Sequence, residues 1–196
     1  MTTIALTRRP FWFLRHGETD WNAEGLSQGA VDVPLNAIGQ AQARTAATLL
    51  PGRGIESIVA SPMSRARDTA VVAGEALGLP VAYDDALREV SFGVMERHPM
   101  ADPWFAAWVD GSETPEGAES FAALRSRAVA AVNAALTRPP LVLIVAHGAL
   151  FRALRAAMGL PPNVRTQNAV PILCVPPANG AAARTLEPAV PGATPI

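Results

Sequence analysis

The stretch that most constrains the fold is "PLVLIVAHG", an almost unbroken apolar run at residues 140–148 that ends in a histidine and a glycine. A strand with one face in water alternates apolar and polar residues, whereas a strand covered on both faces does not. We therefore predict that this segment forms a central strand of a largely parallel sheet. The apolar runs at residues 11–14 and 55–60 are predicted to be its neighbours.

Further short apolar runs, rich in β-forming residues, occur at residues 81–83 and 170–175, and alanine-rich stretches with helical spacing separate most of the runs. Strands that alternate with helices indicate an α/β fold. We expect a three-layer αβα sandwich with a mostly parallel central sheet and a small cap insert. A length of 196 residues, 49% of them hydrophobic, suits one compact domain spanning residues 1–196.

Four segments carry the boundary signals of helices, which are capping residues at the start and glycine or proline at the end. The predicted helices are one capped by Asn36 and stopped by Pro51-Gly52, one from about Met63 to Leu77 ended by Gly78 and Pro80, one with Thr114 as cap and Pro115 in first position, and one that follows His147 directly and runs to Gly159.

Residues 90–111 show no regular pattern, and three aromatic residues, Trp104, Phe105 and Trp108, lie close together there. An irregular segment of this length indicates an insert or cap over one edge of the sheet, which we place at about residues 90–120. The aromatic residues are expected to pack the cap against the sheet, with substrate contact as the alternative.

The C-terminal segment contains an Asn179-Gly180 turn signal, which is typical of a hairpin, and then a Pro/Ala/Gly tail at about residues 188–196 that is predicted to be disordered. Cys174 lies before it in the apolar stretch "VPILCVP" and is predicted to be a buried structural thiol. As the only cysteine, it excludes an internal disulfide and a CxxC metal site.

The charge balance excludes several classes of partner. With 16 basic and 17 acidic residues, the formal charge is -1, so no global field favours nucleic acid or an anionic membrane. The N-terminus lacks the apolar core of a signal peptide, and no run reaches the ~18 apolar residues of a membrane span. We expect a soluble cytoplasmic protein that binds neither nucleic acid nor membrane, with an oligomeric state that the sequence leaves open.

Polar residues follow three of the predicted strands directly. Arg15 and His16 follow "FWFL", Arg65 comes shortly after "SIVA", and His147 follows "LIVA". Because the carboxyl ends of parallel strands meet at one edge of a sheet, these four side chains are expected to converge there. Gly17 is expected to let the backbone leave the strand and turn, so that Arg15 and His16 can both face the crevice.

Such a cluster requires an anion, because two neighbouring guanidinium groups repel unless a negative charge lies between them. Arginine offers a planar fork that fits phosphate oxygens, and the backbone N–H groups of a helix N-terminus add further donors. Taken singly, each histidine would more often be a structural residue, and each arginine would more often be a solvated surface charge. Their joint position at three strand ends favours a phosphate site.

Six segments together resemble the histidine phosphatase superfamily, also called the phosphoglycerate mutase-like family. They are "LRHGETDWN", "DVPLNAIGQAQA", "SPMSRARDTA", "LREVSFG", "TPEGAESF" and "VAHGAL", which occur in the family's order within about residues 11–155. The combination is much more specific than any single tripeptide.

The resemblance implies a role for each matching residue. His16 would be the nucleophile that takes the phosphoryl group, and Glu89 would protonate the leaving oxygen, although Glu89 could instead pair with Arg88 or Arg97. The residues that would hold the phosphoryl group are Arg15, Asn22, Gln28, Arg65 and His147. Phosphoryl transfer needs mainly positioning and charge stabilisation, so neither a metal ion nor another cofactor is implied.

The resemblance favours a metal-independent phosphomonoester phosphatase that acts on a small phosphorylated metabolite through a phosphohistidine at His16. Mutases of the family usually have a longer interval between the positions matched by Glu89 and His147. Mutase-type transfer, a phosphohistidine-protein phosphatase and a non-catalytic phospholigand-binding module remain the alternatives. The cap departs from the family pattern at residues 94–99 and 117–120, which leaves the natural substrate open.

Overall fold

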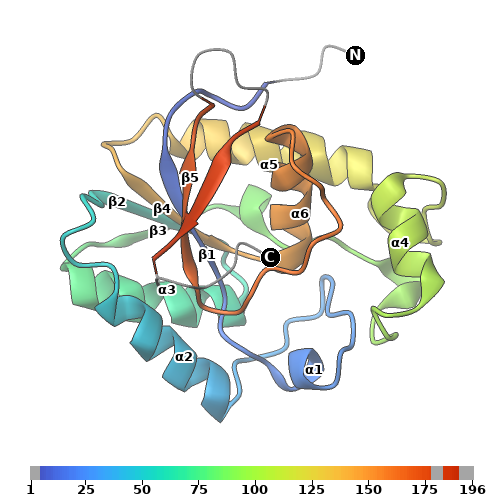
Figure 1. Cartoon of the computed structure of the whole chain (residues 1–196). Helices are drawn as coiled ribbons and strands as arrows, with labels where there is room; N and C mark the ends of the chain where they lie inside the picture. The colour runs from blue at the N-terminus through green and yellow to red at the C-terminus, as the bar shows by residue number, and fades with distance from the viewer. Residues whose placement is uncertain (1–4, 178–182, 190–196) are drawn as a thin grey trace.

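The computed structural model describes residues 5–177 and 183–189, which share one six-stranded sheet (Figure 1). The strand order is β3-β2-β4-β1-β5-β6. The strands β3, β2, β4 and β1 pair in parallel. Beyond β1, β5 pairs antiparallel with β1, and β6 pairs antiparallel with β5. The strands are β1 (Phe11–Arg15), β2 (Ser57–Ala60), β3 (Val81–Tyr83), β4 (Val142–Ala146), β5 (Pro171–Val175) and β6 (Thr185–Pro188). The prediction that β4 is central, with β1 and β2 beside it, is confirmed.

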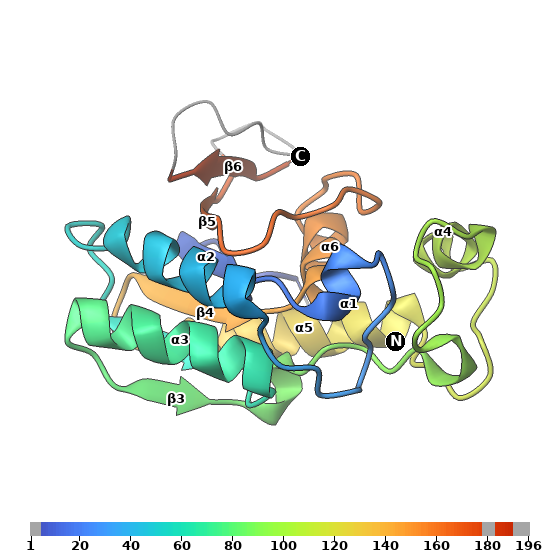
Figure 2. The same ribbon diagram turned by 90° about the horizontal axis from the view of Figure 1, so that it is seen from below.

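Helices cover both faces of the sheet, as the apolar pattern of β4 predicts. Phe13 and Ile144 lie in one core cluster with residues of α5 (Phe121–Ala135) and α6 (Gly148–Ala157), and the two rings of Phe13 and Phe151 stack with centroids 4.1 Å apart. Leu14 and Val145, one residue further along each strand, lie in a second cluster with α2 (Ala37–Thr48) and α3 (Ser64–Leu77). Figure 2 shows the same layers from another side. The αβα sandwich is confirmed.

The predicted helix boundaries hold at three of the four helices. Asn36 caps α2 by accepting the Gly39 N–H at 2.8 Å, α3 ends at the left-handed Gly78, and α6 starts directly after His147. The prediction for the third helix is wrong, because the N-cap residue of α5 is Ser120 and not Thr114.

Helix α5 begins later than predicted because residues 116–119 pair with residues 91–94 instead. The Pro115 carbonyl accepts the Ala118 N–H in a turn, and the Glu119 N–H donates to the Ser91 carbonyl at 2.9 Å. Gly93 makes this close approach possible, since a Cβ there would lie 2.0 Å from the Glu116 carbonyl oxygen.

The cap also contains a helix, α4 (Pro103–Asp110), where the sequence indicated only irregular chain. Its signals were present, because Pro103 occupies the first turn and the left-handed Gly111 ends the helix. Trp108 is fully buried, its ring meets those of Phe92 and Phe121 edge-on, and its Nε1–H donates to the Glu119 carbonyl. These aromatic side chains therefore join the cap to α5, beyond the sheet edge in Figure 1.

The remaining elements are short: α1 (Asp20–Ala23) and two 3-10 turns, η1 (Asp85–Leu87) and η2 (Gly93–Met95). Cys174 is buried as predicted, and burial raises the pKa of its thiol. The Asn179-Gly180 turn and residues 190–196 of the predicted tail lie outside the described residues, while Pro188 belongs to β6. Within the described ranges, no helix has both the length and the apolar character needed to cross a membrane.

Candidate active site

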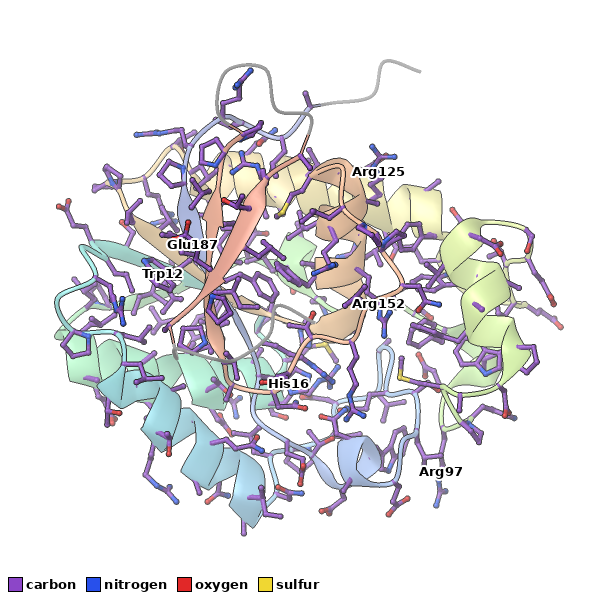
Figure 3. All side chains as sticks on the ribbon, in the orientation of Figure 1. Trp12, His16, Arg97, Arg125, Arg152 and Glu187 are labelled. Atoms are coloured by element: carbon purple, nitrogen blue, oxygen red, sulfur yellow. The ribbon has the colours of Figure 1, made fainter. Side chains whose placement is uncertain are left out.

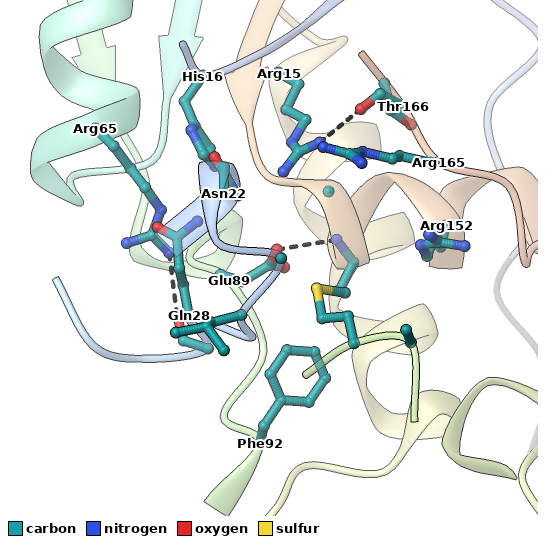
Figure 4. Close-up of a pocket in the computed structure, with 17 residues that line it drawn as sticks. Arg15, His16, Asn22, Gln28, Arg65, Glu89, Phe92, Arg152, Arg165 and Thr166 are labelled. Carbon is teal, nitrogen blue, oxygen red and sulfur yellow. Dashed lines mark hydrogen bonds between the residues drawn. The ribbon is translucent and has the colours of Figure 1, made fainter. Parts of the chain in front are cut away.

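A cavity of about 270 Å³ opens at the carboxyl ends of β1, β2 and β4, where the strand-end motifs meet (Figure 4). Six of the seven predicted site residues line it: Arg15, His16, Asn22, Gln28, Arg65 and Glu89. The seventh, His147, lies directly behind, with its ring centroid 5.4 Å from that of His16. The sequence prediction that separate motifs converge at one sheet edge is confirmed.

His16 is held in one tautomer by its own loop. Its Nδ1 lies 2.7 Å from the Gly17 carbonyl oxygen, and because a carbonyl can only accept, Nδ1 carries the proton and Nε2 keeps its lone pair. The side chain is only 2% exposed. Burial first, and then the charges of Arg65 and Arg15, hold the pKa of His16 well below its ordinary value of 6.5. A neutral ring with a free Nε2 is the form that a nucleophile requires.

Gly17 is required for a reason that differs from the expected turn. It is not among the glycines with positive φ, so its backbone conformation is open to other residues. A Cβ at this position would lie 2.3 Å from the Gly39 carbonyl oxygen, in the first turn of α2. The glycine therefore lets α2 approach the loop after β1, and its N–H donates to Thr69 Oγ1 at 3.1 Å.

Two buried arginines flank His16 and are each anchored by backbone carbonyls. Arg15 Nη1 donates to the Thr166 carbonyl at 2.6 Å, and the Arg65 Nη groups donate to the carbonyls of Val31 and Gly29 at 2.9 and 3.1 Å. Burial lowers the pKa of each to about 10, so both stay charged at neutral pH. The Nε–H of each is buried without a partner among the described residues, which is a donor that an anion can satisfy.

His147 caps α6 and contacts Ser61, with 2.7 Å between its Nε2 and Ser61 Oγ. Its Nδ1 is buried and has no partner among the residues that the structure describes. Burial, followed by the charge of Arg65, holds the pKa of His147 well below 6.5. The second histidine is therefore also neutral, with one ring nitrogen unpaired.

Glu89 lies at the N-terminus of α6. Its carboxylate oxygens accept the N–H groups of Ala149 and Leu150 at 2.9 and 3.0 Å, a position that the helix dipole favours for a negative charge. The alternative partners are elsewhere: Arg88 pairs with Asp85 at 3.4 Å, and Arg97 lies over the Trp21 ring, apart from His16 (Figure 3). The structure therefore does not pair Glu89 with Arg88 or Arg97.

Asn22 and Gln28 complete the polar lining. Asn22 Oδ1 accepts from Asn168 Nδ2 at 3.1 Å, so the Asn22 amide nitrogen is the end left to donate. Asn168 Nδ2 also donates to the His16 carbonyl at 3.0 Å, which ties Asn22 to the His16 backbone. The Gln28 side chain is 7% exposed, and its Oε1 has no partner within the described chain.

The loop that carries Gln28 is held by the cap. Ser27 pairs through its backbone with Arg97 and His98, and the Ala30 N–H donates to Glu96 Oε1, each at 2.9 Å. Hydrogen bonds therefore join the cap to the loop that carries Gln28.

Three further residues at the site were missed by the sequence analysis: Asn168, Arg152 and Arg165. Arg152 stands four residues after Gly148 in α6, so helical spacing puts both on one face and could have found it. Asn168 and Arg165 lie in the irregular segment before β5, where no sequence pattern marks them. Among the described residues, no group of three or more His, Cys, Asp or Glu is placed to hold a metal ion.

The fold and this site define an α/β protein with an arginine-lined pocket beside a buried neutral histidine. The sequence model described as histidine phosphatase superfamily (branch 1) matches residues 11–175. The chain belongs to the histidine phosphatase superfamily.

Known relatives and solved structures agree with this assignment. A probable phosphoglycerate mutase GpmB of Yersinia enterocolitica is 38% identical over 164 residues, which cover 78% of this chain and 76% of the relative. The mycobacterial glucosyl-3-phosphoglycerate phosphatase Rv2419c, solved with VO3, is 31% identical with a TM-score of 0.78, over 93% of this chain and 98% of that one. TTHB049 of Thermus thermophilus is 30% identical with a TM-score of 0.71, over 85% and 93%.

The two buried histidines predict an acid-sensitive stability. Since their pKa values are below 6.5 in the folded state, the unfolded chain binds more protons as the pH falls below 6.5. Each histidine then contributes a loss of up to about 1.4 kcal/mol of unfolding free energy per pH unit. Urea unfolding between pH 7 and pH 5 measures this loss.

The paired variant His16→Asn/His147→Asn should flatten this pH dependence, because asparagine does not titrate. His98→Asn serves as the control, since the His98 ring is exposed. An unchanged pH dependence in the paired variant would show that the two histidines do not cause it.

Proposed function

We propose that this protein is a metal-independent phosphatase that hydrolyses a small phosphomonoester through a phosphohistidine at His16. The observation that carries the proposal is the buried His16 ring, which has its proton held on Nδ1 and its Nε2 without a proton, and which lines one cavity with Arg15 and Arg65. A site that only binds phosphate has no need of a neutral nucleophile and a carboxylate on one cavity.

In the first step, the Nε2 lone pair of His16 forms a bond to phosphorus while the bond from phosphorus to the leaving oxygen breaks. Glu89 must carry a proton when the substrate binds, and it gives this proton to that oxygen as the bond breaks. The unpaired Nε–H groups of Arg15 and Arg65 and the Asn22 amide hold the phosphoryl oxygens. These cations stabilise the charge that spreads over the oxygens in the transition state.

In the second step, a water molecule attacks phosphorus from the side that the leaving group has vacated. Glu89, now ionised, takes the proton of this water, and the bond between phosphorus and Nε2 breaks. Inorganic phosphate leaves, and His16 returns to its neutral state. His147, whose Nδ1 is unpaired, is assigned to the phosphoryl oxygens in both steps.

Hydrolysis is favoured over mutase-type transfer by the compact cap and by similarity to a phosphatase over nearly its whole length. Cap residues Phe92, Met100 and Ala101 line the cavity, which supports a small metabolite rather than a phosphohistidine protein as substrate. The relatives named as probable phosphoglycerate mutases make transfer the second candidate.

Incubation of the enzyme with 3-phosphoglycerate and a trace of 2,3-bisphosphoglycerate separates these two candidates. We expect release of inorganic phosphate without 2-phosphoglycerate, measured by phosphorus NMR, and the same rate in EDTA. Rapid formation of 2-phosphoglycerate would identify a mutase. Complete loss of p-nitrophenyl phosphate hydrolysis in EDTA would contradict the metal-independent mechanism.

A further inference from the structure

We propose that the paired side chains of Glu119 and Arg127 position Glu89 for proton transfer. The inference rests on the proposed function, in which Glu89 protonates the leaving oxygen, and it adds the two residues that hold Glu89 in place. Glu119 and Arg127 are positioning residues, because neither of them lines the cavity that Figure 4 shows.

Glu89 lies in a segment that needs support from outside. Residues 88–91 follow η1 and belong to no helix or strand, so they lack the regular hydrogen bonds that fix a backbone. Leu87 and Val90 are fully buried, but apolar contacts are non-directional and leave the orientation of the peptide groups open. A catalytic group must be held within about 0.5 Å of its productive position. Directional contacts must therefore come from elsewhere in the chain.

Arg127, in α5, holds the backbone just before Glu89. Its Nη1 donates to the Ala86 carbonyl at 2.9 Å and to the Arg88 carbonyl at 2.8 Å. The Arg88 carbonyl belongs to the planar peptide group that leads into Glu89, so this hydrogen bond fixes the orientation of that peptide.

Glu119 orients the guanidinium group of Arg127 and also holds the backbone after Glu89. Its Oε1 and Oε2 accept from Nε and Nη2 of Arg127 at 3.0 and 2.6 Å, which makes a bidentate pair. Its own N–H donates to the Ser91 carbonyl at 2.9 Å, two residues beyond Glu89. The Glu119–Arg127 pair therefore bonds to the chain on both sides of Glu89.

This support directs the Glu89 carboxylate to the N-terminus of α6. There it accepts the N–H groups of Ala149 and Leu150, which lie in the first turn and have no acceptor inside the helix. A rotation of the peptide before Glu89 moves the carboxyl group away from these donors and from the leaving oxygen. A misplacement of about 1 Å can lower a rate by about 10²-fold. The loss of this support should therefore slow the step that needs the Glu89 proton.

The test compares p-nitrophenyl phosphate with phenyl phosphate, which has a similar shape but a leaving group that depends more on protonation. Arg127→Gln should lower kcat/KM by about 10- to 100-fold for phenyl phosphate and by less than about threefold for p-nitrophenyl phosphate. Glu119→Gln keeps the backbone bond to Ser91 and one acceptor oxygen, so the same selective loss should be about three- to tenfold. This milder variant decides the question if Arg127→Gln does not fold. Equal losses on the two substrates, or no loss, would overturn the positioning role.

Arg125→Gln is the matched control for these variants. Arg125 lies on the same helix and is half-buried, and no hydrogen bond from it to the segment around Glu89 is found among the described residues. Its rates on both substrates should equal those of the wild type.

Arg127→Lys separates geometry from charge, because lysine keeps the positive charge but lacks the planar set of donors. It should show the same selective loss as Arg127→Gln. Wild-type rates in Arg127→Lys would assign the effect to charge alone and would overturn the proposal.

A double-mutant cycle tests whether Arg127 acts through Glu89. In the Glu89→Gln background, Arg127→Gln should slow phenyl phosphate hydrolysis by less than about threefold, because no proton is left to position. A further loss as large as the one in the wild-type background would show that Arg127 acts elsewhere.

A readout without turnover keeps this inference separate from the proposed function. If the wild type hydrolyses neither substrate, the proposed function fails, but the position of Glu89 can still be measured. Hydrogen exchange of the Ala149 and Leu150 amides, followed by NMR, reports whether the Glu89 carboxylate accepts them. Arg127→Gln should speed this exchange about tenfold relative to the Phe151 amide, which donates to a backbone carbonyl. An unchanged ratio in the variant would refute the positioning of Glu89 by Arg127.

Discussion

Replacement of His16 by alanine is expected to lower kcat by about 10⁴-fold or more, because removal of a catalytic nucleophile eliminates the covalent route entirely. Hydrolysis of p-nitrophenyl phosphate, followed by absorbance, measures this loss. KM should change little, since Arg15 and Arg65, which we propose to hold the phosphate, remain anchored by backbone carbonyls.

His98→Ala is the matched control for this experiment, because it removes the one histidine whose ring is exposed and lies outside the cavity lining. It should retain the wild-type rate. Residual activity of His16→Ala above a few percent, with normal folding by circular dichroism, would assign the attack on phosphorus to another group.

Glu89→Gln is expected to slow substrates with poor leaving groups by about 10²- to 10⁴-fold, since an alkoxide must be protonated as it departs. p-Nitrophenyl phosphate should lose much less, because p-nitrophenolate is stable without a proton. A plot of log kcat against leaving-group pKa should therefore steepen in the variant.

The contacts of Glu89 complicate this substitution, so stability must be measured beside the rates. Both of its oxygens accept N–H groups of α6, and glutamine can keep only one of these hydrogen bonds. Thermal unfolding of Glu89→Gln reports that loss, with Glu56→Gln, at an exposed position, as the control. A uniform rate loss across all leaving groups would indicate that Glu89 only holds α6.

The convergence of the site could be predicted from the sequence because parallel strands place their carboxyl ends together. The runs before Arg15, Ser61 and His147 identify three such strands, and their order in the sheet follows from the apolar character of β4. The reason for Gly17 could not be predicted, since it depends on Gly39, a residue 22 positions away that approaches only in the folded chain.

The cap was harder to predict because its structure depends on pairing between distant segments. Thr114 and Pro115 carry a valid helix-start signal, but residues 116–119 bond to residues 91–94 instead, and the helix starts at Phe121. Local propensity is weaker than such tertiary pairing. The position of Asn168 at the site could not be predicted for the same reason. Its contact with His16 joins residues 152 positions apart in the sequence.

The measurement that tests the central claim most directly is the capture of the intermediate. The enzyme is mixed with a ³²P-labelled phosphomonoester, quenched in alkali within milliseconds, digested and analysed by mass spectrometry. The mechanism predicts a base-stable, acid-labile phosphoryl group on the peptide that contains His16, and none in His16→Ala. Equal labelling of the variant, or a label on any other residue, would contradict the role of His16 as nucleophile.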